Sequence, residues 1–349
     1  MPEVAAYAAP SPRARFVPFK VPRREPGPND VVIAIRYCGI CHSDVHQARD
    51  EWGAGTFPMV PGHEIVGEVV RAGAAVKRLR AGDLAGVGCF VDSCRTCESC
   101  RRDLEQFCEK GAAFTYNSTE MDRRTQTYGG YSKQIVVDER FTLRIAPGQE
   151  LEKVAPLLCA GITTYSPLRH WKVGKGTRVG VVGLGGLGHM AVKLAAAMGA
   201  EVTLFSTSPA KEADARRLGA HEFALTTERG AFKRFSNRLD LIVDAASAPH
   251  DYDKFLGMLR VDGAMVLLGV PPEPTPLRAY SLISGRRSLA GSLIGGIAET
   301  QEMLDFCAER RIGADVEVIP IQKIDEAYDR MVKNDVRYRF VIDVATLQG

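Results

Sequence analysis

The chain has 349 residues, of which 45% are hydrophobic and 25% are charged, and its formal net charge is +3. This length exceeds one ordinary hydrophobic core and predicts two domains. The near-neutral charge argues against nucleic acid and anionic membranes as partners. The N-terminal segment lacks the apolar run of a signal peptide, and no stretch of about eighteen apolar residues predicts a membrane span, so we expect a cytoplasmic protein.

The first half of the chain is rich in glycine and in short strand-like segments. Apolar or alternating runs predict strands at 31–40, 64–73, 81–90 and 131–145. Few helical stretches interrupt them. This pattern is typical of a β-rich, barrel-like unit.

Within this half, four cysteines lie in one short segment, at Cys94, Cys97, Cys100 and Cys108. Such short spacers let one loop surround a tetrahedral Zn²⁺ with four thiolates. Disulfides are a weaker interpretation, because we find no signal peptide that would direct the chain to an oxidising compartment. An iron–sulfur cluster is a closer alternative, but its bacterial cysteine run ends in proline, where Glu109 stands here. Four protein ligands leave no open position, so we expect this zinc to stabilise the loop and not to catalyse a reaction.

From about residue 155 the pattern changes to an alternation of strands and helices, which predicts a parallel, doubly wound sheet. The expected order is a strand with a glycine-rich turn at 178–188, a helix at 189–200, a strand at 201–207, a helix at 209–220, a strand at 239–247, a helix at 251–260, and strands at 264–270 and 288–296. A helix at 299–310, a β pair and a helix at 324–334 follow. We expect this last part to return to the first domain.

The glycine-rich turn between the first strand and helix of this alternation is a candidate dinucleotide site. It consists of Gly183, Leu184, Gly185, Gly186, Leu187 and Gly188. The first glycine of G-x-G-x-x-G permits the tight turn, the second lets a pyrophosphate approach the backbone, and the third lets helix and strand pack closely. The pattern alone is weak and fits a plain connector, but the alternation that follows it favours phosphate binding at the helix N-terminus.

The end of the strand expected at 201–207 determines whether NAD(H) or NADP(H) is preferred. An NAD enzyme usually has Asp or Glu there to bind the ribose 2′-hydroxyl. Here Ser206, Thr207 and Ser208 are followed by Lys211, so hydroxyls and an ammonium can hold a 2′-phosphate. We therefore predict NADP(H). These residues can also cap the next helix, since Ser208 before Pro209 is a good N-cap, and the two roles are compatible.

Three distant segments carry residues for a second metal site. Cys41, His63 and Cys159 would supply two thiolates and an imidazole, the ligands of a catalytic zinc with one open position. Glu64 is either a direct ligand or a carboxylate that supports the ligands. The spacing of these residues in the sequence does not distinguish a metal site from core packing. Buried structural cysteines and a packed histidine therefore explain them about equally well. Cys38 forms C-x-x-C with Cys41, but it ends an apolar strand and is expected in the core.

Together these features resemble the zinc-containing medium-chain dehydrogenase/reductases, and most of all their cinnamyl alcohol dehydrogenase-like branch of NADPH-dependent aldehyde reductases. The resemblance spans about residues 30–343 and is carried by CGICHSDVHQ, FPMVPGHEIVGEV, the four-cysteine loop, YGGYS, PLLCAGITTYSPL, GLGGLGHMAVKLA and NDVRYRFV. It implies an α/β fold, with a GroES-like β-rich catalytic domain over 1–154 and 295–349 and a Rossmann domain over 155–294. It also implies two zinc ions per subunit, one catalytic and one structural, and a homodimer.

The resemblance assigns roles to individual residues. Cys41, His63 and Cys159 match the catalytic zinc ligands, with Glu64 as an alternate ligand. The cysteines of the short segment match the ligands of the structural zinc: Cys94, Cys97, Cys100 and Cys108. Ser43 matches the hydroxyl that passes the substrate proton, and His46 matches the next member of that relay. Glu51 stands where this branch often has Asp, so a third relay member is left open.

Further matches concern the cofactor and the substrate pocket. His42 matches a residue that faces the cofactor pyrophosphate. The nicotinamide half is expected to contact Thr163, Gly269, Ser292, Leu293 and Ile294. The walls of the substrate pocket are expected to include Trp52, Phe114 and Leu293.

The resemblance thus implies a zinc-dependent enzyme that transfers a hydride between NADP(H) and a primary alcohol or aldehyde, aliphatic or aromatic and cinnamyl-type. One alternative on the same fold is the reduction of polarised C=C or C=N bonds, against which Ser43 and His46 argue. Another is a non-catalytic sensor that binds zinc and NADPH, which the complete set of metal ligands and relay residues disfavours. A preference for NAD(H) is a lesser alternative.

Overall fold

The computed structural model describes residues 3–348, and the chain forms two compact units. The first consists of Met1–Ile162 and Gly295–Gly349, and the second is Thr163–Ile294. The division at 162/163 falls within helix α4 (Ala160–His170). The domain ranges expected from the sequence, with a first boundary at 154/155, stay a prediction.

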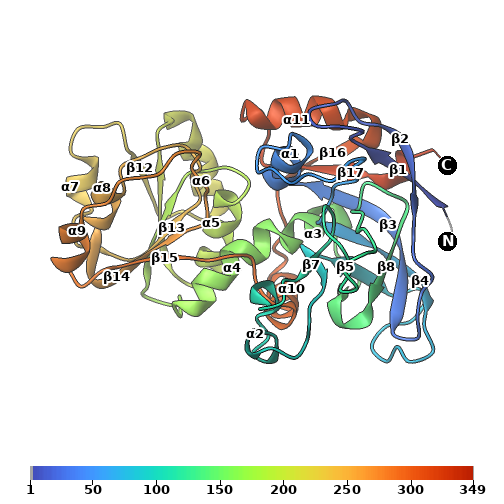
Figure 1. Ribbon diagram of the computed structural model, residues 1–349. Coiled ribbons are helices and arrows are strands. Elements are labelled where there is room, and N and C mark those ends of the chain that lie inside the picture. The colour runs from blue at the N-terminus through green and yellow to red at the C-terminus, as the bar shows by residue number, and fades with distance from the viewer. Residues whose placement is uncertain (1–2, 349) are drawn as a thin grey trace. The chain divides into compact units, whose positions relative to one another are not determined.

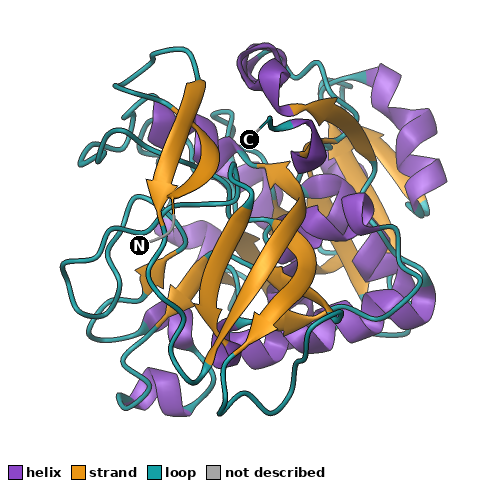
Figure 2. Ribbon diagram, turned by 90° about the vertical axis from the view of Figure 1, so that its right-hand side faces the viewer, coloured by secondary structure: helices purple, strands orange, loops and turns teal. Residues whose placement is uncertain are grey.

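The first unit is built on a seven-stranded sheet in which β3 is central. The strand order is β16-β17-β3-β4-β5-β9, and β8 also pairs with β3. Its strands are β3 (Asp30–Ile40), β4 (Ile65–Ala72), β5 (Leu84–Val87), β8 (Gln134–Asp138), β9 (Leu143–Arg144), β16 (Val316–Pro320) and β17 (Arg339–Asp343). Figure 2 shows these strands in orange, with loops and short helices around them. The long apolar run at 31–40 allows β3 to pair antiparallel with β17, β4 and β8.

Two antiparallel strand pairs and several helices complete this unit. The pairs join β1 (Glu3–Ala8) to β2 (Val17–Pro22) and β6 (Phe90–Asp92) to β7 (Ala113–Phe114). The helices are α1 (His42–Ala48), α2 (Glu98–Arg101), α3 (Leu151–Val154), α10 (Ile297–Arg310) and α11 (Ile324–Val332). The β-rich character predicted for this half is therefore confirmed.

The second unit contains a six-stranded parallel sheet (Figure 1). Its strands are β10 (Arg178–Val182), β11 (Glu201–Ser206), β12 (Glu222–Leu225), β13 (Leu239–Asp244), β14 (Leu259–Leu267) and β15 (Ser288–Gly291). Their order is β12-β11-β10-β13-β14-β15, and every neighbouring pair is parallel. The order reverses between β10 and β13, as in a Rossmann fold, and ligands of such sheets bind at the carboxyl ends of the strands there. The predicted doubly wound sheet is confirmed.

Helices connect these strands and cover the sheet. They are α5 (Gly188–Ala197), α6 (Glu212–Leu218), α7 (Ala231–Arg234), α8 (Tyr252–Leu256) and α9 (Ala279–Ile283). One part of the core is aromatic: Phe205 of β11 makes edge-to-face contacts with Phe235 and Phe255. Such pairs add specific geometry to the burial of apolar surface.

Several predicted elements differ in the structure. The β pair expected before the last helix is one strand, β16, and its partner β17 follows α11. The strand expected at 131–145 is divided into β8 and β9, because the Asp138 carboxylate accepts a hydrogen bond from the Arg140 N–H and caps a short 3₁₀ turn. The helix expected at 251–260 ends at Leu256, because β14 already begins at Leu259. The helix expected at 209–220 begins with a 3₁₀ turn and ends at Gly219, whose φ of 113° only glycine adopts easily. Within the described range, no helix combines the length and apolar character that a bilayer crossing needs.

Candidate active site and metal centres

Two thiols, an imidazole and a carboxylate converge in the first unit. Cys41 precedes α1, His63 and Glu64 precede β4, and Cys159 precedes α4. One potential ligand atom of each lies within 4.8 Å of the others, and all four residues are buried. The sulfurs of Cys41 and Cys159 are 3.8 Å apart. Two thiolates and an imidazole are the donors that a catalytic zinc prefers, so this set fits Zn²⁺.

Asp44, which was not predicted as a site residue, positions the histidine of this cluster. Its carboxylate lies 3.2 Å from Nδ1 of His63 and accepts hydrogen bonds from the backbone N–H groups of Cys41 and Gly62. This contact leaves Nε2 of His63 for a metal. A local signal existed, because Asp44 is the third residue of α1 and completes a capping box with Cys41.

The ionisation of the cluster follows from these contacts. Burial opposes the charged imidazole, but the nearby Asp44 carboxylate outweighs it and the pKa of His63 lies well above its usual value. The hydrogen bond between the two thiols lowers the pKa of Cys41 well below its usual value and raises that of Cys159. A thiolate beside a second thiol favours binding of a divalent cation.

Glu64 has one paired and one unpaired carboxylate oxygen. Arg339 of β17 donates a hydrogen bond to Oε1, and both side chains are almost completely buried. Oε2 is buried without a hydrogen-bond partner. An unpartnered buried oxygen next to two thiols and an imidazole fits a place beside a metal cation. Arg339 belongs to the NDVRYRFV motif, which contributes to the family resemblance, but no role was predicted for this residue.

The residues expected to form a proton relay lie on and after α1. The Ser43 Oγ is 3.6 Å from the Cys41 sulfur. Nδ1 of His46 is 2.6 Å from the Glu51 carboxylate, and its ring stacks on Trp52 with centroids 5.0 Å apart. A carboxylate therefore lies beside His46, and the relay itself stays a prediction.

The remaining predicted residues of this unit are at the surface. His42, the first residue of α1, is exposed. Trp52 is 53% exposed and Phe114 is 43% exposed, and Leu293 of the second unit is 49% exposed. Their roles at the cofactor and in the substrate pocket stay predictions.

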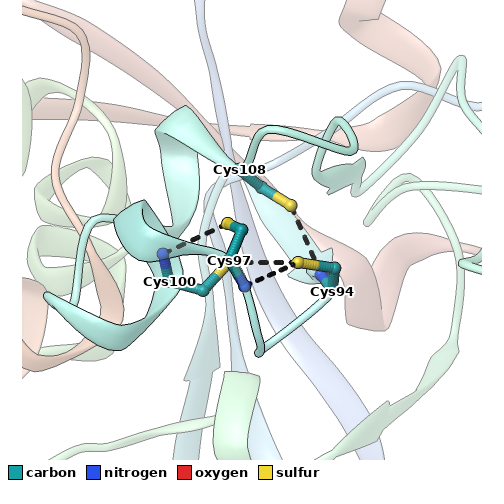
Figure 3. Close-up of side chains that lie close together, drawn as sticks. All are labelled: Cys94, Cys97, Cys100 and Cys108. Carbon is teal, nitrogen blue, oxygen red and sulfur yellow. Dashed lines mark hydrogen bonds between the residues drawn. The ribbon is translucent and has the colours of Figure 1, made fainter.

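The four-cysteine segment forms a second cluster with its sulfurs facing one another (Figure 3). Cys94 and Cys100 sulfurs are 3.9 Å apart. Backbone N–H groups donate to three of the sulfurs: Cys97 to Cys94, Cys100 to Cys97, and Cys94 to Cys108. All nine cysteines of the chain are free thiols in the structure. This arrangement fits a closed tetrahedral zinc site and not disulfides.

The glycine loop of the second unit lies between β10 and α5 and leaves room for a ligand. Gly183 has φ 87°, and a Cβ on Gly188 would come within 2.0 Å of the Gly183 carbonyl oxygen, so both positions require glycine. A Cβ on Gly185 would meet no atom within 4 Å. The space at Gly185 is where a pyrophosphate is expected to approach the backbone.

Other candidate cofactor residues lie at the same edge of the parallel sheet. Ser206 ends β11, Gly269 follows β14, and Ser292, Leu293 and Ile294 follow β15. Thr163 is buried within α4. Gly269 must be glycine, because a Cβ there would lie 2.3 Å from the Ala246 carbonyl oxygen.

The hydroxyl-rich turn after β11 does not form the side-chain helix cap that was considered for it. Ser208 occupies the N-cap position of the 3₁₀ turn, but its side chain makes no capping hydrogen bond. Instead, the Ser208 N–H donates to Oγ of Ser206 at 3.1 Å. Thr207 is exposed, and Lys211 lies in the turn that follows. No carboxylate lies at 206–211, so the turn fits a 2′-phosphate.

Two family models match successive parts of the chain. The alcohol dehydrogenase GroES-like domain matches residues 27–147, and the zinc-binding dehydrogenase model matches residues 186–309. The fold and the two clusters of metal ligands therefore define a dehydrogenase class of oxidoreductase.

Individual relatives narrow this class. The chain is 54% identical to the aldehyde reductase YahK of Escherichia coli, with 99% of this chain and 98% of the relative covered. It is 53% identical to the NADP-dependent alcohol dehydrogenase C of Mycobacterium tuberculosis, with 99% and 100% covered. A cinnamyl alcohol dehydrogenase structure from Helicobacter pylori, solved with NADP(H), is 43% identical with a TM-score of 0.92 and 99% coverage of both chains. The chain belongs to the zinc-containing medium-chain dehydrogenase/reductase family, in its cinnamyl alcohol dehydrogenase-like branch.

Proposed function

We propose that this enzyme reduces aldehydes to primary alcohols and catalyses the reverse oxidation, with NADP(H) as the hydride carrier. The observation that carries the proposal is the convergence of Cys41, His63, Glu64 and Cys159 into one buried donor set. The names of the close relatives, an aldehyde reductase and an NADP-dependent alcohol dehydrogenase, support it.

In this proposal each residue of the first unit has a defined task. When bound, the zinc ion supplies a Lewis acid for the carbonyl oxygen and NADPH supplies the hydride. Cys41, His63 and Cys159 hold the metal, with Glu64 as the alternate donor. Asp44 fixes the orientation of His63 through the contact at Nδ1.

The proton of the product hydroxyl comes through α1. Ser43 holds a hydroxyl proton beside the ligand set, 3.6 Å from the Cys41 sulfur. His46 is half-buried and exchanges protons with solvent, and Glu51 orients its ring through the 2.6 Å contact at Nδ1. The path therefore runs from solvent to His46 and then to Ser43.

The second unit binds the cofactor. The glycine loop at 183–188 holds the pyrophosphate, and Ser206, Thr207, Ser208 and Lys211 hold the 2′-phosphate. The support for NADP(H) is the absence of an acidic residue at 206–211 and the NADP(H) bound in the related Helicobacter pylori structure. A homodimer in the cytoplasm belongs to the same proposal, and light scattering tests the dimer.

Cinnamaldehyde tests the reaction directly, because it contains both a carbonyl and a conjugated C=C bond. We expect NADPH to be oxidised with formation of cinnamyl alcohol, and NADH to be used at least about tenfold less efficiently. Formation of 3-phenylpropanal would instead show reduction of the C=C bond. Binding of NADPH without oxidation by aliphatic, benzylic or cinnamyl aldehydes would indicate a sensor.

A further inference from the structure

The segment 245–249, which follows β13, packs against two glycines at the cofactor edge of the parallel sheet. A Cβ on Gly183, at the start of the glycine loop, would lie 3.4 Å from the Cβ of Ala246. A Cβ on Gly269, after β14, would lie 2.3 Å from the Ala246 carbonyl oxygen. The segment therefore lies where the strand order of the sheet reverses, which is where dinucleotides bind in folds of this kind.

One pair of side chains ties the end of β13 to this segment. Asp244, the last residue of the strand, is buried, and its carboxylate accepts a hydrogen bond from the Ala246 N–H at 3.2 Å. Nε2 of His250 lies 3.0 Å from the other oxygen of that carboxylate. Nδ1 of the same ring lies 2.8 Å from the Ala248 carbonyl oxygen. The imidazole thus joins the end of the strand to the middle of the segment.

The middle of the segment depends on such side-chain contacts for its order. Residues 247–249 are exposed and belong to no helix or strand. Exposed backbone outside regular structure opens at a low free-energy cost unless specific contacts hold it. The position of the segment beside the glycine loop therefore responds to the strength of the contacts made by His250.

The protonation state of His250 determines how many of these contacts are made. Both ring nitrogens face oxygen acceptors, so only the imidazolium can donate to Asp244 and to Ala248 at once. The neutral ring has one N–H, and either tautomer leaves one acceptor facing a bare nitrogen. Burial disfavours the proton, but the hydrogen bonds to Asp244 and Ala248 and the charges of Asp244 and Asp251 outweigh it, and the pKa of His250 is raised.

The other titratable groups around the imidazole come from α8. Tyr252 contacts the ring edge to face with centroids 5.0 Å apart, and burial raises the pKa of this tyrosine, so it stays neutral. Asp251 is the N-cap of the helix, and Lys254 pairs with it at 3.5 Å. Within residues 3–348, the ion-pair partner of the buried Asp244 carboxylate is the imidazole itself. Asp244 is therefore the main charge that holds the proton on the ring.

We propose that the pair formed by Asp244 and His250 positions the segment 245–249 for the dinucleotide, so that a proton on His250 tightens NADP(H) binding. This inference rests on the proposed cofactor site of the second unit. His250 is a positioning residue, because it acts through the segment and not on the reacting atoms. Without the proton one contact is lost, and the dinucleotide must order the segment as it binds, which lowers its affinity. By linkage, bound NADP⁺ raises the pKa of His250 in return.

The pKa of His250 with and without saturating NADP⁺ tests this linkage. It is measured by NMR on the zinc-loaded protein with isotope-labelled histidine, and the His250 signal is the one that His250→Gln lacks. We expect NADP⁺ to raise the pKa by at least about 0.5, which corresponds to about threefold tighter binding by the protonated form. An unchanged pKa would overturn the proposal.

Asp244→Asn separates the effect of the pair from that of the phosphate charges, which would also raise the pKa of a nearby histidine. This variant keeps the shape of the side chain but removes the charge that holds the imidazolium. We expect NADP⁺ to raise the pKa of His250 in Asp244→Asn by less than half of the rise in the wild type. An equal rise in both proteins would show that the phosphates act alone and that the pair has no positioning role.

NADPH affinity gives a second measurement, by fluorescence titration of His250→Gln beside the wild type. The ratio of the two Kd values cancels the titration of the 2′-phosphate, which both proteins experience alike. We expect the variant to bind about threefold or more weakly at about pH 6, where His250 is protonated, and about equally at about pH 9. His170→Gln, which replaces an exposed histidine at the end of α4, is the matched control and should equal the wild type at both values.

The outcomes distinguish this proposal from the proposed function. A ratio of Kd values that does not change with pH, while the wild type binds NADPH and reduces aldehydes, would overturn the role of the pair alone. A wild type that binds no NADPH at either pH would refute the cofactor site and this proposal with it. A ratio that falls toward one as the pH rises, together with the higher pKa in the NADP⁺ complex, supports the proposal.

Discussion

At the residue scale, Asp44 shows how one side chain can organise a metal site that it does not itself join. It contacts the His63 ring and accepts hydrogen bonds from the backbone N–H groups of Cys41 and of Gly62, which precedes His63. We predict that Asp44→Asn, which keeps the shape but removes the charge, lowers zinc affinity about 10- to 100-fold. Chelator competition measures the affinity, and a value equal to that of the wild type would show that Asp44 does not support the metal.

Another residue-scale feature is the pair formed by Asp244 and His250 in the second unit. Nε2 of His250 lies 3.0 Å from the Asp244 carboxylate, and Nδ1 lies 2.8 Å from the Ala248 carbonyl oxygen. Burial disfavours the charged ring, but the hydrogen bond to Asp244 outweighs it and the pKa of His250 is raised. Both ring nitrogens therefore face acceptors, which favours the protonated form.

This raised pKa predicts a pH-dependent contribution to stability. The folded chain binds the proton more tightly than the unfolded chain, in which the histidine pKa is about 6.5. The contribution is fully present below that value and is lost as the pH rises through the folded pKa. The stability difference between wild type and His250→Gln should thus be larger at acidic than at alkaline pH in urea unfolding. A difference that does not change with pH would contradict this.

At the element scale, the turn from β10 to α5 contains one glycine that folding requires and another that NADPH binding is expected to require. Gly188→Ala should lower the melting temperature, because the new Cβ would meet the Gly183 carbonyl oxygen. Gly185→Ala should keep the melting temperature, because nothing lies within 4 Å, but should weaken NADPH binding about tenfold or more. Thermal unfolding and fluorescence titration measure the two effects. Equal NADPH affinity in Gly185→Ala and wild type would place the pyrophosphate elsewhere.

Elements with a local signal were predictable from the sequence, and those that depend on tertiary contacts were not. The β10–α5–β11 unit and the four-cysteine loop have their determinants within a few residues. By contrast, the convergence of Cys41, His63 and Cys159 depends on β3, β4 and α4 packing together, so spacing left it undecided. Asp44 was missed although it lies between recognised residues, and the contact between Asp244 and His250 is visible only in three dimensions.

At the scale of the whole molecule, the two metal clusters are expected to have separable effects. Cys97→Ser removes one ligand of the four-cysteine cluster while Ser can still cap α2. We predict a loss of one zinc ion per chain and a melting temperature lower by on the order of 5–10 °C. Cys307→Ser is the matched control, because this buried thiol belongs to neither cluster. An unchanged zinc content in Cys97→Ser would refute the structural zinc site.

The most direct test of the catalytic metal site measures zinc content, NADPH affinity and cinnamaldehyde reduction in Cys159→Ala beside the wild type. The wild type should hold two zinc ions per chain and reduce the aldehyde. The variant should hold one zinc ion, bind NADPH with nearly wild-type affinity and reduce no aldehyde. Wild-type turnover by the variant would contradict the assignment of Cys159, Cys41 and His63 to a catalytic metal.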